Sequence, residues 1–357
     1  MIKIAYVSTY EPQVCGIGTY CKNLIDSLHN KIDAKVFNEG TYWKRGTPMG
    51  QLAHQILEWG PDIIHVQHAY GFFFQIPEFV SFLKLVRDKN IVITFHEIPT
   101  YDHQLWYDDV PAMFIFPHKT ALEYAQKRFG FNGKYEIIPH GATLFETIPK
   151  DLARDKLNLP KDRIILVQPG FWGYGKGIKE LIEASSILKN EYNLIVAFAG
   201  GMHPVAIEED RRFFKKALMT ANSLNLKDNL IFTGKHLSED ELNLWISAAD
   251  IVVLNHQFVY PAISSSAIGK RVIDSGKPCI FGDDPRLSEF EDGKVCLKVK
   301  SDNPTDIASK IKTLINNPSL EESLGINAKE FANKLSWNEI GKKHLDLYER
   351  LANNGKL

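Results

Sequence analysis

One pattern occurs twice in this chain and constrains its fold more than any other feature. Each copy is an apolar strand-like run, a turn that contains glycine, and an amphipathic helix. The runs are Ile2–Ser8 and Ile164–Gln168, and the turns are Cys15–Gly18 and Gly170–Gly177. Glycine lets a phosphate approach the backbone, and the positive end of the following helix attracts it. Neither turn reads G-x-G-x-x-G, so the dinucleotide fingerprint is not met. The two copies predict two nucleotide-binding domains that face one cleft.

Strand-like runs alternate with helix-like stretches in both halves of the chain, which predicts an α/β fold with parallel sheets covered on both faces. The further runs in the first half are Ala34–Phe37, Ile63–Gln67, Ile91–Thr94, Met113–Phe116 and Glu136–Ile138. Those in the second half are Leu194–Ala199, Leu230–Thr233, Ile251–Leu254, Pro278–Phe281 and Val295–Val299.

The domain boundary is expected near residues 145–160, where Pro149 and Pro160 interrupt the pattern. We therefore expect Rossmann-like domains over residues 1–150 and 151–335. Helices dominate after Asn303, and Ser238-Glu239-Asp240-Glu241 has the form of a capping box. The last helix, over residues 336–357, carries an apolar stripe that we expect to pack back on the N-terminal domain; the stripe is Trp337, Ile340, Leu345, Tyr348 and Leu351.

Composition excludes several classes of protein. The 357 residues carry a net charge of −1, so no overall field draws the chain to nucleic acid, although a local basic patch remains open. Four cysteines show no C-x-x-C spacing, which favours free thiols in a reducing compartment. The chain shows neither a signal-peptide pattern nor about 20 consecutive apolar residues. We expect a cytoplasmic protein.

Lys176 is the strongest single candidate for chemistry. It lies in the glycine-dense turn that also contains Gly170 and Gly175, at the start of a helix, where a cation without an anion is unfavourable. The functional interpretation is a clamp for a diphosphate. The structural alternative is an exposed turn lysine.

Histidines follow several of the predicted strands. His96 ends the strand Ile93-Thr94-Phe95-His96, at the edge of a parallel sheet where functional side chains gather, but it could instead be a hydrogen-bonded core histidine. His65 and His68 flank Gln67 at the end of another strand, and His140 follows Pro139. No cysteine or carboxylate cluster has ligand spacing with these histidines, so no metal site is expected.

A serine run precedes a short predicted helix. Ser264, Ser265 and Ser266 could hold a phosphate or ribose at that helix terminus, or could simply cap the helix. Lys270 and Arg271 lie on the same helix, as surface charges or as anion ligands. A further segment, Ala69–Phe74, contains Tyr70 and Phe72; it is either core or a surface for an apolar acceptor.

Together these segments resemble the GT-B-fold glycosyltransferases, most of all the retaining glycosyltransferase family 4, over nearly the whole chain. The motifs that carry the resemblance are Glu11-Pro12 through Tyr20, His65-Val66-Gln67-His68, Thr94-Phe95-His96, Ile138-Pro139-His140-Gly141, Gly170 through Gly177, Phe232-Thr233-Gly234-Lys235, Ala248-Ala249-Asp250 and Gly276-Lys277-Pro278. Each is weak alone, but their order is specific. The resemblance implies two Rossmann-like domains, of which the first binds the acceptor and the second binds a nucleotide-sugar.

Two departures from the family's pattern stand out. The family usually places two glutamates before the Gly-x-Pro turn, where this chain has Ile263 and Arg271. It also often has an arginine where this chain has Phe171. We expect the serine run, Asp274 and Arg271 to supply the missing donor contacts.

The resemblance implies transfer of a sugar from a nucleotide-sugar to an acceptor hydroxyl, with retention and without a metal. The acceptor would be a glycan, a lipid-linked molecule or another hydroxyl compound, and peripheral contact with the inner face of the membrane remains open. No cofactor is expected, since the nucleotide-sugar is a co-substrate. The alternatives are a GT-B transferase of another stereochemical course and a non-catalytic homologue that regulates a true enzyme.

The expected site residues fall into three groups. His96 and Lys176 are expected to be catalytic. The donor-binding set is Gly16, Ile17, Gly18, Gly170, Gly175, Lys235, Ser264, Ser265, Ser266 and Arg271. The acceptor-side set is His68, Tyr70, Phe72 and His140.

Overall fold

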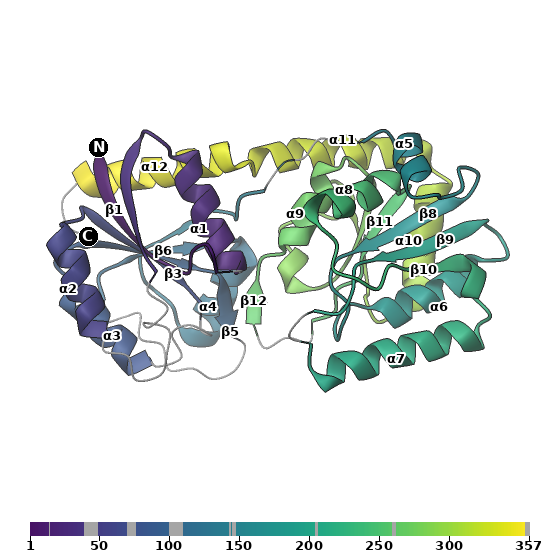
Figure 1. Ribbon diagram of the computed structural model, residues 1–357, viewed down its shortest axis with the longest axis horizontal. Coiled ribbons are helices and arrows are strands. Elements are labelled where there is room, and N and C mark those ends of the chain that lie inside the picture. Colours follow the sequence, from purple (N-terminus) through teal and green to yellow (C-terminus); the bar gives the residue numbers. More distant parts are fainter. Residues whose placement is uncertain are drawn as a thin grey trace. The chain divides into compact units, whose positions relative to one another are not determined.

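The computed structural model describes residues 1–13, 15–38, 49–69, 76–99, 110–142, 144, 148–203, 206–258 and 262–353. The chain forms two compact units (Figure 1). Unit 1 consists of Met1–Ala142, Pro261–Ser265 and Leu335–Leu357, and unit 2 of Thr143–Tyr260 and Ser266–Lys334. The chain therefore passes to unit 2 at residue 143. A short segment, Pro261–Ser265, returns to unit 1, and the expected division into residues 1–150 and 151–335 did not include this return.

Unit 1 is built on a parallel sheet with the described strands in the order β2-β1-β3-β4-β6-β7. These strands are β1 Ile2–Val7, β2 Ile32–Phe37, β3 Ile63–His68, β4 Asn90–Phe95, β6 Met113–Phe116 and β7 Tyr135–Ile137. The helices are α1 Gly16–Ser27, α2 Met49–Trp59, α3 Ile76–Leu85, α4 Lys119–Phe129 and α12 Trp337–Asn353.

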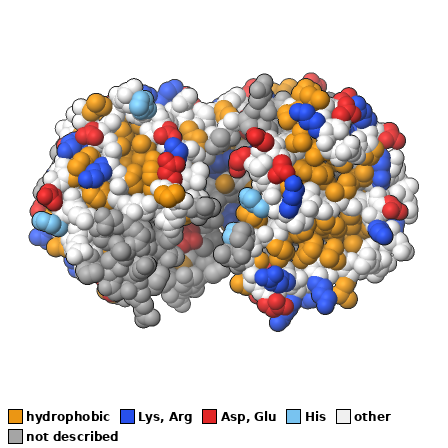
Figure 2. Space-filling model, viewed as in Figure 1, with side chains coloured by type: hydrophobic (Ala, Val, Ile, Leu, Met, Phe, Trp, Pro, Cys, Tyr) orange, Lys and Arg blue, Asp and Glu red, His pale blue; other side chains and the backbone are white. Residues whose placement is uncertain are grey.

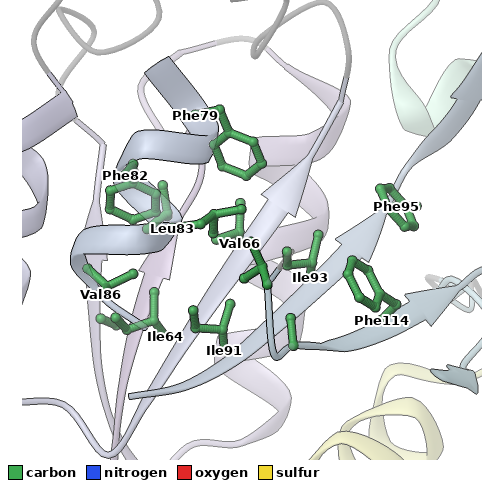
Figure 3. Packing of buried hydrophobic residues seen from close by; sticks show 14 of the residues in the cluster. Ile64, Val66, Phe79, Phe82, Leu83, Val86, Ile91, Ile93, Phe95 and Phe114 are labelled. Carbon is green, nitrogen blue, oxygen red and sulfur yellow. The ribbon is translucent and has the colours of Figure 1, made fainter. Parts of the chain in front are cut away.

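The central strands of unit 1 present different chemistry on their two faces, because successive side chains of a strand point to opposite sides. Ile64 and Val66 of β3, with Ile93 of β4, pack against Phe79 and Phe82 of α3 in a buried apolar cluster (Figure 3). The alternate residues of both strands point to the other face, where polar side chains are buried.

That other face is covered by α1 and α12. Helix α12 contacts α1, β1 and β3, and it lies beside α1 in Figure 1. Of the apolar stripe along α12, Ile340, Tyr348 and Leu351 are buried, while Trp337 and Leu345 are half-buried. The C-terminal helix thus belongs to the same compact unit as the first strands of the chain.

Unit 1 also contains an antiparallel strand pair, β5 (Glu97–Pro99) with β12 (Ala262–Ser264). Neither strand was predicted, because Glu-Ile-Pro and Ala-Ile-Ser each offer one large apolar residue and no strand-like run. His118 secures the pair: its Nδ1 accepts from the Ala121 amide at the start of α4, and its Nε2 donates to the Ser264 carbonyl at 3.1 Å.

Unit 2 has a second parallel sheet with the described strands in the order β10-β9-β8-β11-β13-β14. These are β8 Ile164–Pro169, β9 Leu194–Ala199, β10 Leu230–Phe232, β11 Ile251–Leu254, β13 Cys279–Gly282 and β14 Leu297–Val299. The helices are α5 Lys150–Lys156, α6 Ile178–Leu188, α7 Glu208–Ser223, α8 Glu239–Ala248, α9 Ala267–Asp274, α10 Pro304–Ile315 and α11 Pro318–Lys334, with 3₁₀ turns at Lys227–Asn229 and Pro285–Leu287. Both sheets confirm the predicted fold class, and the capping box at Ser238 starts α8 as predicted.

The described surface bears charges of both signs. On the face drawn in Figure 2, basic and acidic side chains are interspersed over both units, and neither sign forms a continuous field. Among the described helices, none combines the length and apolar character that crossing a bilayer requires.

Candidate functional site

In unit 2, the glycine-dense turn follows β8 and leads into α6. Gly170, Gly175 and Gly177 adopt positive φ angles of 109°, 73° and 59°, which side chains of other residues rarely tolerate. The turn is held from both ends: the Trp172 amide donates to the Gly201 carbonyl at 2.8 Å, and the Gln257 amide donates to the Gly175 carbonyl at 2.9 Å. The predicted turn is therefore a fixed part of the edge of the sheet.

Asp210, near the start of α7, anchors the same turn. Its carboxylate accepts from the Tyr174 amide at 2.8 Å and from the Ile207 amide at 3.0 Å. A Cβ at Gly173 would lie 2.5 Å from the Asp210 carboxylate, so glycine is needed there for this contact.

Lys176 is half-buried in this turn, and its ammonium lies 3.5 Å from Nε2 of His256. Burial and the nearby Arg286 lower the pKa of Lys176 to about 8, despite the carboxylates of Asp284 and Asp210. Burial, together with Lys176 and Arg286, also keeps the pKa of His256 well below its ordinary value, so this imidazole is neutral. The turn therefore holds a destabilised cation that an anion would stabilise.

Lys176, His256 and Arg286 follow three neighbouring strands, β8, β11 and β13, at their carboxyl ends. Arg286 is fixed by Asp284, which accepts from Nε at 2.8 Å and from the terminal Nη2 at 2.6 Å. The side chain of Asp284 is completely buried, and it also accepts from the Arg286 amide. We call Lys176, His256, Asp284 and Arg286 the basic edge of unit 2.

Two predicted donor ligands are paired with other side chains. Lys235 forms an exposed ion pair with Glu241 at 2.6 Å. Arg271 of α9 donates to Asn243 at 3.0 Å and pairs with Glu239, both from α8. These pairs would not prevent either side chain from binding a ligand. However, no contact among the described residues places Lys235 or Arg271 at the basic edge.

The serine run does not form one helix terminus, which corrects the expectation that all three serines lie there. Ser264 is the last residue of β12 in unit 1, whereas Ser266 caps α9 in unit 2 by accepting from the Gly269 amide at 3.2 Å. Ser265, the last residue of that unit 1 segment, lies between them. The chain crosses from one unit to the other within the run, and sequence alone gave no sign of that crossing.

Phe171, where the family often has an arginine, contacts two histidine rings. Its ring centroid lies 4.5 Å from that of His203 and 5.5 Å from that of His236, and the latter pair is stacked. An aromatic cluster therefore adjoins the glycine-dense turn instead of a further cation.

In unit 1, the other predicted turn leads into α1. Gly16 and Ile17 open the helix and Gly18 follows, with no acidic residue in the first turn and no side-chain cap from Cys15. A Cβ at Gly18 would lie 3.3 Å from the Thr9 carbonyl group, so the helix start packs closely on the end of β1. A helix start leaves its first amides without partners inside the helix, and such a site suits an anion.

His96 follows β4 in unit 1 and is buried, with 7% of its surface exposed. Its ring packs edge-on against Tyr20 at 4.8 Å and lies 4.9 Å from the ring of His140, between centroids. Burial lowers the pKa of His96 to about 3, so the imidazole is neutral at physiological pH. The structure thus brings the predicted His96 and His140 together.

The remaining acceptor-side predictions have different positions. His68 is completely buried on the α3 face of the sheet, against Phe79 and Phe95, so its ring is not exposed to an acceptor. Tyr70 and Phe72 lie outside the described residues. A groove of about 670 Å³ in unit 1 is lined by none of the expected site residues; its lining is Tyr10, Glu11, Lys35, Val36, Phe37, Asn38, Gln55, Glu58 and Trp59.

Sequence reasoning missed Asp210, His256, Asp284 and Arg286. Three of these follow β11 or β13, so the strand-end rule that selected His96 would also have found them. Asp210 gave no such signal, because its role depends on where α7 begins relative to the turn. Within the described residues, no group of three or more His, Cys, Asp or Glu side chains is arranged to hold a metal ion.

Comparisons with known proteins agree with this fold. The family model described as glycosyl transferases group 1 matches residues 149–331. The chain is 24% identical over 324 residues to a D-inositol 3-phosphate glycosyltransferase 2 of Catenulispora acidiphila, covering 87% of this chain and 69% of that one. It is 23% identical over 332 residues to a D-inositol 3-phosphate glycosyltransferase of Nocardioides, covering 87% and 66%. The chain thus spans about two thirds of the length of these relatives.

A solved structure is similar over almost the whole chain. The crystal structure of Anabaena HepE in complex with UDP and glucose has a TM-score of 0.75 and 14% identity, and covers 98% of this chain and 100% of that one. At this identity the similarity concerns the fold. The family model, in contrast, matches just over half of the sequence, including the glycine-dense turn and the basic edge. The chain therefore belongs to the glycosyl transferases group 1 family.

Proposed function

We propose that the protein transfers a sugar from a nucleotide-sugar donor to an acceptor hydroxyl. The observation that carries this proposal is the basic edge of unit 2. There, Lys176 and Arg286 both follow strand ends, and the pKa of Lys176 is lowered to about 8 by burial and by Arg286. A diphosphate bound at this edge would offset that repulsion, with the amides of the glycine-dense turn as further donors.

The same charges would act on the reaction itself. Transfer breaks the bond between the sugar's anomeric carbon and a phosphate oxygen, and negative charge develops on the departing diphosphate. Lys176 would stabilise that charge as it develops, where electrostatic stabilisation lowers a barrier most. The acceptor oxygen forms the new bond, and its proton passes to the departing phosphate. We propose that the transfer retains the anomeric configuration, as the family resemblance implies. The acceptor would then attack on the face that the diphosphate leaves.

Unit 1 would contribute His96 and the start of α1. His96 is neutral and buried, so it suits hydrogen bonding to a sugar hydroxyl better than it suits proton abstraction from an alcohol. The exposed Gly16 at the start of α1 leaves amides that could also face a phosphate. We propose that both groups orient the donor.

The donor and acceptor are proposed by class. The structural relative HepE was crystallised with UDP and glucose, which makes a UDP-sugar the first donor to test. A relative from Campylobacter jejuni, 26% identical over 254 residues, is named for transfer to a diphospho-undecaprenol acceptor. A lipid-linked hydroxyl acceptor, reached by peripheral contact with the inner face of the membrane, is therefore proposed beside glycans and other hydroxyl compounds. We also propose that no metal is required, because lysine and arginine supply the positive charge.

The proposal is tested first by a thermal-shift screen against UDP-, GDP- and ADP-sugars, because a ligand that binds the native state raises the melting temperature. Lys176→Ala should then lower the transfer rate roughly 100-fold, since loss of a charged contact to a leaving group costs about 3 kcal/mol. The matched control is Lys179→Ala, which removes a lysine of α6 that pairs with Glu183.

Near-normal turnover by Lys176→Ala would refute the clamp. If no nucleotide-sugar shifts the melting temperature and none is turned over, the non-catalytic homologue becomes the better description. Binding of a nucleotide-sugar without transfer to any tested acceptor would point to that alternative as well.

A further inference from the structure

A line of buried polar side chains in unit 1 has no role in the reaction as proposed so far. His65 and Gln67 of β3 and Thr94 of β4 are completely buried, and so are Tyr6 of β1 and Tyr348 of α12. Burying polar groups is unfavourable unless each finds hydrogen-bond partners. Apolar residues would fill the same space at lower cost, so the arrangement calls for a functional explanation.

The side chains form a continuous hydrogen-bonded chain that starts at His96. Nε2 of His96 lies 2.9 Å from Oε1 of Gln67, and Nε2 of Gln67 lies 3.2 Å from Nε2 of His65. The other nitrogen of His65, Nδ1, lies 2.6 Å from the Tyr348 hydroxyl, which is 3.1 Å from the Tyr6 hydroxyl. We call this the His96–Tyr348 chain.

The donors and acceptors in this chain fix where the protons lie. An amide oxygen can only accept and an amide nitrogen can only donate, so Gln67 requires a proton on Nε2 of His96 and a lone pair on Nε2 of His65. His65 then carries its proton on Nδ1 and donates it to Tyr348. The Thr94 hydroxyl, 2.8 Å from Nε2 of His65, adds a second donor to the same lone pair.

Both histidines are neutral, which gives each a single proton to place. Burial lowers the pKa of His96 to about 3, and burial with the neighbouring His344 and His96 keeps the pKa of His65 well below its ordinary value. Nδ1 of His96 makes no hydrogen bond with any described residue. It therefore has a lone pair to offer a donor from outside the protein.

The Tyr348 end of the His96–Tyr348 chain is held in place by α12. A Cβ at Gly341 would lie 2.4 Å from Oγ of Ser27, so the glycine lets α12 pack closely on the Ser27 side chain of α1. The Ala142 amide donates to the Leu335 carbonyl at 2.7 Å just before the helix, and the Asn90 side chain donates to the Leu351 carbonyl near its end. Tyr348 is thus placed by contacts along the length of the helix.

We propose that Gln67 is a positioning residue that holds His96 as its Nε2–H tautomer, with Nδ1 as a hydrogen-bond acceptor, and that the C-terminal helix sets this state through Tyr348 and His65. This inference rests on the proposed function of His96 and adds the origin of its proton state. A neutral imidazole held this way accepts a hydrogen bond from a sugar hydroxyl and cannot donate through Nδ1.

The proton state can be read directly by ¹⁵N NMR of histidine-labelled protein, because the two tautomers have different nitrogen shifts. The wild type should show His96 as the Nε2–H form. Gln67→Met removes both amide hydrogen bonds at similar size, so His96 should populate both tautomers. Gln67→Glu keeps an acceptor facing His96 and should retain the Nε2–H form there, although its carboxylate cannot donate to His65. Tyr348→Phe should disturb His65 first and His96 less.

Tyr20→Phe is the matched control for the NMR measurement. It also removes a buried hydroxyl near His96. That hydroxyl lies 3.4 Å from Nε2 of His344 and is not part of the His96–Tyr348 chain. The nitrogen shifts of His65 and His96 should keep their wild-type tautomer assignment in this variant.

Kinetics then test the link to the reaction. Gln67→Met should lower kcat roughly tenfold to a hundredfold with little change in KM, and Gln67→Glu should recover most of the loss, because misplacing a reacting group by a small distance is costly. A wild-type His96 in the Nδ1–H form, or an unchanged tautomer in Gln67→Met, would overturn the inference. So would a normal kcat beside an altered tautomer. If the wild type transfers no sugar at all, the proposed function fails, while the NMR result still decides the origin of the proton state.

Discussion

The lowered pKa of Lys176 predicts how nucleotide-sugar binding depends on pH. With a pKa of about 8 in the ligand-free protein, Lys176 is about 90% protonated at pH 7 and about 10% at pH 9. A bound diphosphate favours the charged ammonium and raises this pKa. Binding therefore takes up a proton above pH 8, and the affinity decreases as the pH rises through that value.

The size of the effect follows from these fractions. Between pH 7 and pH 9 the Kd should rise about tenfold, which corresponds to about 1.4 kcal/mol. Proton uptake on binding should be about 0.1 at pH 7 and about 0.9 at pH 9, provided that the complex keeps Lys176 charged. Isothermal titration calorimetry in two buffers of different ionisation enthalpy measures both quantities. A nucleotide-sugar suits the test because its diphosphate is esterified at both ends and does not titrate near neutral pH.

Lys176→Arg is the control, because a guanidinium stays charged throughout this range. Its affinity should change little between pH 7 and pH 9. Lys277, ahead of β13, also has a pKa lowered to about 8 by burial, but it is present in both proteins, so the difference between them isolates Lys176. Equal pH dependence in the two proteins would refute the assignment of the titrating group. A flat profile in the wild type would show that Lys176 does not meet the diphosphate.

Three further predictions concern metal dependence and stability. Transfer should survive EDTA without loss of rate, and recovery only on adding magnesium or manganese would contradict the metal-free proposal. Asp250→Asn should lower the free energy of unfolding by about 3 kcal/mol at pH 7, measured by urea denaturation, because it leaves the buried Arg154 without its carboxylate partner at 2.6 Å. Burial raises the pKa of Asp250, but hydrogen bonds from Lys150 and the Ile165 amide, with the charges of Lys150 and Arg154, outweigh it and hold this pKa below its ordinary value. The contribution of Asp250 to the free energy of unfolding is therefore present above about pH 4 and is lost at lower pH. The variant should accordingly lose less stability than the wild type on acidification. Gly141→Ala should destabilise by about 2 kcal/mol, since its Cβ would lie 2.4 Å from the Trp337 ring, whereas Gly50→Ala, with nothing within 4 Å, should not; equal denaturation midpoints would refute this.

Local patterns predicted the two sheets well. The bounds of Met113–Phe116, Leu194–Ala199 and Ile251–Leu254 match the observed strands, because each is a buried apolar run between clear turn signals. The glycine-dense turn was also visible, since its glycines are needed for positive φ angles. These features depend on residues close together in the sequence.

The packing of the last helix on the N-terminal domain was predicted, but other features that depend on distant segments were not. The pairing of β5 with β12 joins stretches of three residues each, from different parts of the chain, so no local period announced it. The split of the serine run has the same cause. Tyr348 was expected to be a packing residue of an apolar stripe, and only its position opposite His65 gives its hydroxyl a role.

The discontinuity of unit 1 limits how parts of this chain can be exchanged with those of a relative. An exchange of N-terminal halves between relatives at a single crossover near residue 142 would separate β1–β7 from the strand that pairs with β5 and from α12. Tyr6 and His65 would then meet a foreign helix in place of Tyr348. A hybrid intended to inherit unit 1 of this protein intact must therefore carry residues 261–265 and 335–357 together with residues 1–142.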